Sequence, residues 1–208
     1  MKLIRIALLA GFTLISSCSI LPKPEPFEMY RLPSAQSNAS ASQGTPQRWS
    51  LRLSKFQSSD ALNRPNIAVI PQGDVISHYK GSRWSDPAPV LVRNRLLEGF
   101  QHDGRVPLLS TDDSIFQTDL ELGGSLLAFQ TEYQGTMASV MVRLDALLVR
   151  SYDQRILASR RFEVRQPLSD AQVPAVVVGF GQANDQLTAQ VVNWAVEQGQ
   201  RLAPPPMP

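Results

Sequence analysis

The strongest constraint on the fold comes from three long segments in the second half of the chain, in which apolar and polar side chains alternate. They cover residues 120–133, 136–152 and 155–165, and short turn sequences separate them. Such alternation is typical of antiparallel hairpins that bury one face and expose the other. We therefore expect a meander of three strands, with Gly123-Gly124 marking a bulge in the first.

A long helix is predicted to follow the meander over residues 174–202, because its apolar residues recur at helical spacing. They form one stripe that consists of Phe180, Ala183, Leu187, Val191, Trp194 and Leu202. Gly179 and Gly181 weaken the first turns of this helix by about 1 kcal/mol each. The stripe predicts that the helix packs on the sheet.

Earlier in the chain, apolar segments indicate strands at residues 48–56, 67–70 and 75–79, and the first of these places Trp49, Leu51 and Leu53 on one face. A helix is expected next. Its start is marked by a capping residue, Ser85 or Asp86, followed by Pro87 or Pro89 in the first turn. Its end is marked by Asp103-Gly104, since glycine accepts the left-handed conformation that closes helices.

This order of elements predicts an α+β fold. We expect a mainly antiparallel sheet with two principal helices packed on it, one mid-chain and one C-terminal.

The N-terminal segment resembles a bacterial lipoprotein signal. Lys2 and Arg5 precede about ten apolar residues, too few for a membrane-spanning helix of roughly 20 residues. Ile15-Ser16-Ser17-Cys18 resembles the lipobox, at which a signal peptidase cuts before a diacylated cysteine. An ordinary secretory signal is the alternative. Cys18 is the one cysteine of the chain, so it has no disulfide partner within it, and acylation accounts for it.

These features predict four regions. Residues 1–17 form the signal peptide, and residues 18–48 carry the lipidated cysteine, a Pro-rich tether, a short strand within 27–32 and a Ser/Ala-rich loop over 34–42. Residues 49–202 form a globular domain, and residues 203–208 form a disordered tail. The residue directly after the cysteine is Ser19 and not an aspartate. This resembles the sorting signal of lipoproteins at the periplasmic face of the outer membrane.

The residue inventory gives no indication of an enzyme, a metal site or a cofactor. His78 and His102 are the only histidines of the sequence, and both are interpreted as surface or capping residues. Asp112-Asp113-Ser114 is interpreted as a loop or cap and not as an acid pair. Removal of Lys2 and Arg5 with the signal leaves 18 basic and 18 acidic residues. A neutral chain lacks the basic field that favours nucleic-acid binding.

One segment has two interpretations. Tyr79 and Trp84 flank a Gly-containing turn ahead of the first helix. Both rings could fill the core under that helix. Alternatively, Tyr79, Arg83 and Trp84 could form a contact surface for a partner, since aromatic residues with polar groups are favoured at interfaces.

Several of these segments resemble the ABC-type transport auxiliary lipoproteins. Tyr30-Arg31-Leu32 is similar to their tyrosine-leucine element, and residues 67–71 are similar to their short strand that ends in proline. Tyr79 and Arg83-Trp84-Ser85-Asp86 resemble their tyrosine, arginine-tryptophan and acidic element. Lys80-Gly81 after the tyrosine and the long Ser/Ala-rich insertion depart from the pattern.

The resemblance implies a non-catalytic lipoprotein of a trans-envelope ABC/MCE-type lipid transport system. Its expected partner is an MCE-domain protein, and its expected position is the outer membrane, where it docks the transport conduit. Direct phospholipid binding and homo-oligomer formation stay open. The alternatives are an outer-membrane assembly lipoprotein, for lipopolysaccharide or β-barrel insertion, and a lipoprotein activator of peptidoglycan synthesis.

Overall fold

The computed structural model describes residues 26–33 and 44–202. The predicted signal peptide, Cys18, the Ser/Ala-rich loop and the C-terminal tail lie outside the described residues.

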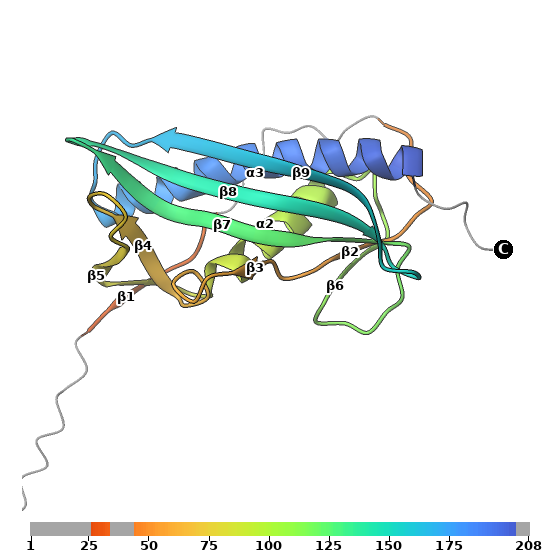
Figure 1. Cartoon of the computed structure of the whole chain (residues 1–208), viewed down its shortest axis with the longest axis horizontal. Helices are drawn as coiled ribbons and strands as arrows, with labels where there is room; N and C mark the ends of the chain where they lie inside the picture. Colours follow the sequence, from red (N-terminus) through yellow and green to blue (C-terminus); the bar gives the residue numbers. More distant parts are fainter. Residues whose placement is uncertain (1–25, 34–43, 203–208) are drawn as a thin grey trace, which may run out of the picture.

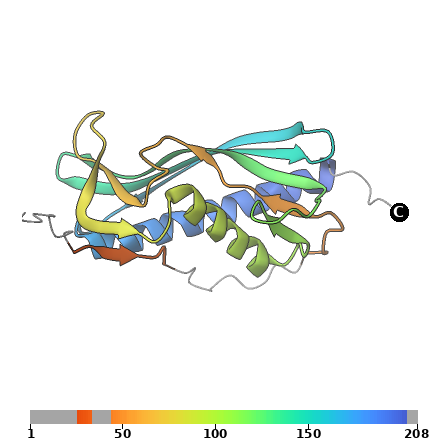
Figure 2. The ribbon, with the colours of Figure 1, turned by 90° about the horizontal axis from the view of Figure 1, so that it is seen from below.

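The described chain forms two layers, a nine-stranded sheet and two helices that lie on the same side of it (Figures 1 and 2). The strands are β1 (Glu28–Tyr30), β2 (Leu51–Leu53), β3 (Gln57–Ser58), β4 (Asn66–Ile70), β5 (Ser77–Trp84), β6 (Leu109–Thr111), β7 (Leu120–Gln134), β8 (Met137–Arg150) and β9 (Arg155–Pro167). The helices are α2 (Ala88–Asp103) and α3 (Val173–Leu202). The α+β class and the two helices are as predicted.

The prediction of a mainly antiparallel sheet is confirmed in part, because the sheet is mixed. β7 pairs in parallel with β2, β3 and β4 along one edge, and β1 pairs in parallel with β5. The alternation of side chains indicates which face of a strand is buried, but it contains no information on strand direction. The hairpins β4–β5, β7–β8 and β8–β9 are antiparallel as their turns require, whereas strands that are distant in the sequence pair in parallel.

The meander itself is confirmed. β7, β8 and β9 pair in antiparallel order, and the turns place Gly135 at φ 63° and Gln154 at φ 56°. The inner face of β8 is buried, and its outer face joins β9 through ion pairs between Arg143 and Glu163 and between Asp145 and Arg161. One face of the meander is therefore core and the other is charged.

The expected bulge at Gly123-Gly124 is wrong in position. β7 stays paired with β8 through both glycines, and the register shifts between Leu126 and Ala128 instead. Gly124 has φ 124°, and a Cβ at this position would collide with the carbonyl oxygen of Asp145 on β8. The glycine is needed for close strand approach.

The predicted start of α2 is partly wrong. Its N-cap is Pro87, without a side-chain hydrogen bond, and the Ser85 hydroxyl donates to the Asp86 carboxylate at 2.9 Å instead of capping the helix. The end is confirmed, since Gly104 is left-handed at φ 74° and its N–H donates to the Phe100 carbonyl at 3.1 Å.

The stripe of α3 is buried against the sheet as predicted, from Phe180 to Trp194. The two helices also pack closely on each other. Gly99 of α2 faces Thr188 of α3, and Gly199 of α3 faces the indole of Trp49, with no room for a Cβ at either glycine. Glycines thus set how near the helices and the sheet approach each other.

We predict that Gly99→Ala lowers the free energy of unfolding by about 1–3 kcal/mol, because the added methyl overpacks against the γ-methyl of Thr188. The double variant Gly99→Ala/Thr188→Ser removes that methyl and should recover most of the loss. Urea unfolding of both variants and of Thr188→Ser alone measures this coupling. Equal stability of Gly99→Ala and the native chain would contradict the close approach.

Candidate functional site

The segment that follows the predicted tether is fixed to the sheet. β1 pairs with β5 so that Tyr30 lies beside Trp84, and the Ser85 N–H donates to the Tyr30 carbonyl at 2.8 Å. The guanidinium of Arg83 lies 3.4 Å from the centroid of the Phe27 ring, which adds a cation–π contact. The strand predicted within residues 27–32 is therefore confirmed, and the chain enters the folded body at Phe27.

Trp84 belongs to the core. Its indole is fully buried and meets Phe180 and Phe129 edge to face at centroid distances of 5.2 and 6.0 Å. The core interpretation is therefore correct for Trp84, and its ring is not available as a contact surface in this fold. The expected turn at Gly81 is absent, because β5 continues through this residue, at φ 69°, to Trp84.

Tyr79 and Arg83 lie on the same strand as Trp84, but both are partly exposed. Burial raises the pKa of the Tyr79 phenol above its ordinary value, so the hydroxyl stays protonated at neutral pH. A binding role for these two residues stays a prediction.

A hollow of about 720 Å³ lies between β1 and α2. It is lined by Met29, Tyr30, Arg31, Leu32, Pro33, Ser85, Leu91, Asn94, Arg95 and Glu98. The buried cation in its wall, Arg95, lies 3.1 Å from Glu98 and 3.6 Å from Asp185. Because two carboxylates already neutralise Arg95, the hollow is a poor site for an anion.

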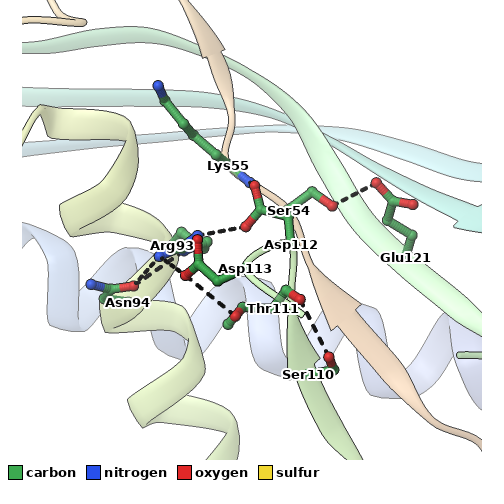
Figure 3. A network of polar contacts seen from close by, with 9 residues as sticks. All are labelled: Ser54, Lys55, Arg93, Asn94, Ser110, Thr111, Asp112, Asp113 and Glu121. Atoms are coloured by element: carbon green, nitrogen blue, oxygen red, sulfur yellow. Dashed lines mark hydrogen bonds and ion pairs between the residues drawn. The ribbon is translucent and has the colours of Figure 1, made fainter. Parts of the chain in front are cut away.

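A second polar cluster joins α2 to the loop after β6 (Figure 3). The guanidinium of Arg93 lies 2.5 Å from Asp112 and 2.8 Å from Asp113, and the Lys55 N–H donates to Asp112 at 3.0 Å. Burial alone would raise the pKa of Asp112, but the Lys55 N–H and Arg93 outweigh it and lower the pKa. As expected, the two aspartates lie in a loop, and they clamp this loop to α2.

Exposed apolar side chains gather at the two ends of the molecule, a feature that the sequence analysis missed. One group surrounds the entry of the chain and the tips of the β4–β5 and β7–β8 hairpins, and we name it the tether end: Phe27, Met29, Val75, Ile76, Met137 and Val178. The other group lies at the opposite end, and we name it the distal end: Leu108, Ile115, Phe116, Tyr152 and Ile156. Figure 1 shows these two ends at the left and right.

The distal end has the most exposed apolar pair. Ile115 is 98% and Phe116 67% exposed. Their loop is nevertheless held, because Arg52 donates to the Phe116 carbonyl and Arg93 binds the two aspartates just before it. The signal in the sequence is an apolar pair inside a polar turn, which the strand and helix patterns do not capture.

Within the described ranges, His, Cys, Asp and Glu residues form no group of three that could hold a metal ion. None of the helices described is both long and apolar enough to cross a membrane.

A family model for the ABC-type transport auxiliary lipoprotein component matches residues 30–192. Among solved structures, a Xanthomonas campestris protein of the DUF330 family is similar with 27% identity and a TM-score of 0.76, covering 84% of this chain and 97% of that chain. A further uncharacterised protein shares the fold with 16% identity and a TM-score of 0.63, covering 82% of this chain and 99% of that chain. The comparison with curated proteins gives no match.

Trp84→Ala should lower the free energy of unfolding by about 3–5 kcal/mol, because it leaves a cavity between Phe129 and Phe180. Arg83→Ala, beside it on β5, should cost about 1 kcal/mol or less, since it removes a partly exposed side chain. Denaturant unfolding of both variants measures the difference. A stable Trp84→Ala variant would contradict the core interpretation.

Asp112→Asn should lower the free energy of unfolding at pH 7 by about 1.5–3 kcal/mol, because it removes a charged hydrogen-bond acceptor. The pKa of Asp112 is lower in the folded than in the unfolded chain. The stabilisation is therefore fully present above the unfolded pKa of about 3.9 and is lost as the pH falls through the folded pKa. The difference between native and variant stability should shrink below about pH 4.

Urea unfolding between pH 7 and pH 3 measures this difference. Asp60→Asn, at an exposed position, is the control and should change stability by no more than about 0.5 kcal/mol. A native-to-variant difference that does not depend on pH would contradict the role of the Asp112 carboxylate.

Proposed function

The chain belongs to the ABC-type transport auxiliary lipoprotein family, and from this premise we propose that it is the non-catalytic lipoprotein component of a trans-envelope ABC/MCE-type lipid transport system. In this proposal Cys18 carries the lipid anchor at the periplasmic face of the outer membrane. The folded body then docks the MCE-domain protein that forms the transport conduit.

The observation that carries the proposal is the extent of the family match. Residues 30–192 begin in β1 and end in α3, so the match takes in the whole two-layer body and not one module of it. The family is defined by transport auxiliary lipoproteins, and the described residues build a scaffold that agrees with an auxiliary role. Their buried charges, Arg93 and Arg95, are paired with carboxylates and serve to hold elements together.

The core favours docking over lipid carriage. The space between sheet and α3 is filled by side chains, with Phe129 and Phe180 stacked at 4.5 Å and Phe162 against Trp194 at 5.6 Å. The hollow of about 720 Å³ lies outside this core, between β1 and α2, and polar or charged residues such as Asn94, Arg95 and Glu98 form about half of its wall. A lipid chain prefers an apolar cavity, so we propose that the body does not carry lipid in its core.

The distal end is the proposed docking surface for the MCE-domain protein. It lies opposite the end at which the chain enters the fold. In this proposal it therefore faces away from the membrane, towards a partner that spans the periplasm. Ile115 and Phe116 project from a loop that is clamped by Arg52 and Arg93. A fixed, exposed apolar pair resembles the anchor residues of interfaces, because little conformational entropy is lost when it binds.

In-cell crosslinking of the lipidated protein, followed by purification and mass spectrometry, tests the proposal. We expect an MCE-domain protein among the crosslinked partners. Phe116→Asp should lower its recovery about tenfold, equivalent to about 1.4 kcal/mol of binding free energy. Leu127→Asp, at an exposed apolar position away from both ends, is the matched control and should leave the recovery unchanged.

Recovery of a different class of partner in place of an MCE-domain protein would overturn the proposal. Recovery of β-barrel assembly or lipopolysaccharide machinery would favour the assembly alternative. Recovery of a peptidoglycan synthase would favour the activator alternative.

A further inference from the structure

The tether end of the fold combines exposed apolar residues from three separate places. Val75 and Ile76 form the tip of the β4–β5 hairpin and are 63% and 56% exposed, and Met137 after the β7–β8 turn is 70% exposed. The register places both hairpin tips at one end of the sheet, since Val69 pairs with Ser77 on one side and with Thr131 on the other. Val178, in the second turn of α3, is 53% exposed at the same end.

The length of the chain before β1 limits how the body can be oriented. Pro26 lies eight residues after Cys18. A fully extended chain of that length reaches at most about 29 Å. If Cys18 carries the lipid anchor, Pro26 therefore stays within that distance of the membrane surface.

The distal end is too far away to face the membrane under this limit. Pro33 packs on Gly181 of α3, and the helix continues for 21 residues to Leu202 at the distal end. At 1.5 Å per residue this part of α3 is about 31 Å long. β1 runs parallel to β5, away from the hairpin tip, so Pro26 lies farther still from the distal end.

The outer face of the sheet is also unsuited to contact with lipid. It has ion pairs between Arg143 and Glu163, between Asp145 and Arg161 and between Arg165 and Glu132. Paired surface charges of this kind are stable in water and costly to place in an apolar medium. The apolar tips of the tether end are the part of the surface that suits a lipid interface.

We propose that the tether end is a membrane-contact surface, whose apolar tips Val75, Ile76 and Met137 insert into the interfacial region of the phospholipid layer. The body would then stand on the membrane with its distal end directed away from it. Apolar side chains at hairpin tips gain free energy when they leave water for this region, and the anchor holds them close to it. The inference rests on the proposed anchorage of Cys18, but not on the identity of the transport partner.

The test uses the full-length lipoprotein, reconstituted into phosphatidylcholine vesicles that contain brominated acyl chains. Ile76→Cys and, as the matched control, Ile115→Cys are each labelled with an environment-sensitive fluorophore. Acylation blocks the sulfur of Cys18, so the label attaches to the introduced cysteine alone. We expect quenching by bromine of about twofold or more at position 76 and little at position 115.

The possible results separate the two proposals. An anchored, vesicle-bound protein with equally weak quenching at positions 76 and 115 would overturn the contact surface and leave the anchor intact. Labelling of Cys18 itself, together with failure to float with vesicles, would overturn the anchor and the orientation with it. Quenching at position 76 in a protein that captures no MCE-domain partner in cells would support the contact surface and count against the proposed function.

A second set of variants tests whether the tips act together. A fluorophore at Met137→Cys should lose most of its quenching when Val75→Asp/Ile76→Asp is added, because two charges oppose insertion of the neighbouring hairpin. Ile115→Asp/Phe116→Asp, at the distal end, should leave it unchanged. All four positions are exposed, so neither pair should unfold the body. Undiminished quenching at position 137 in the Val75→Asp/Ile76→Asp variant would overturn insertion of the hairpin tip.

Discussion

Hydrogen bonding along both edges of β7 is the constraint on which the rest of the structure depends. One edge pairs with β8 over almost its whole length, and the other edge receives β2, β3 and β4 in succession. A central strand with both edges paired leaves few backbone groups to satisfy by other means. Its inner face supplies Leu122, Leu126 and Phe129 to the core, which α3 covers. Gly124 makes the pairing possible, since a side chain there would push β8 away.

Sequence patterns could predict the elements that depend on local periodicity. The meander, the end of α2 at Gly104 and the apolar stripe of α3 follow from alternation, helical spacing and a left-handed glycine, all of which are local properties. The parallel pairing of β2 to β4 with β7 could not be predicted in this way, because short apolar segments form the same pattern in either direction. Strand direction here depends on which segments meet β7 across long distances in the sequence, and periodicity contains no information on that.

The candidate site was harder to predict because exposure is a property of the assembled fold. Trp84 lies three residues after Gly81 and shortly before a helix, which suits an exposed turn as well as it suits a core position. The choice is made by Phe129 and Phe180, which come from β7 and α3 and enclose the indole. Ile115 and Phe116 show the reverse case: they are as apolar as core residues, yet no element covers them. Clusters formed by distant segments cannot be read from local spacing.

The charged clamp at Arg93 gives the distal loop a defined position, and this bears on how such a loop can bind. A mobile loop loses conformational entropy when it is ordered by a partner, and that cost reduces affinity. Arg93 binds Asp112 and Asp113 immediately before Ile115, and Arg52 binds the Phe116 carbonyl. Most of the conformational entropy of this loop is therefore lost when the chain folds, and little remains to be lost when a partner binds. The carboxylate of Asp113 is largely exposed, so its pair with Arg93 adds little stability by itself. Together with Asp112 it holds an apolar pair in water in one conformation.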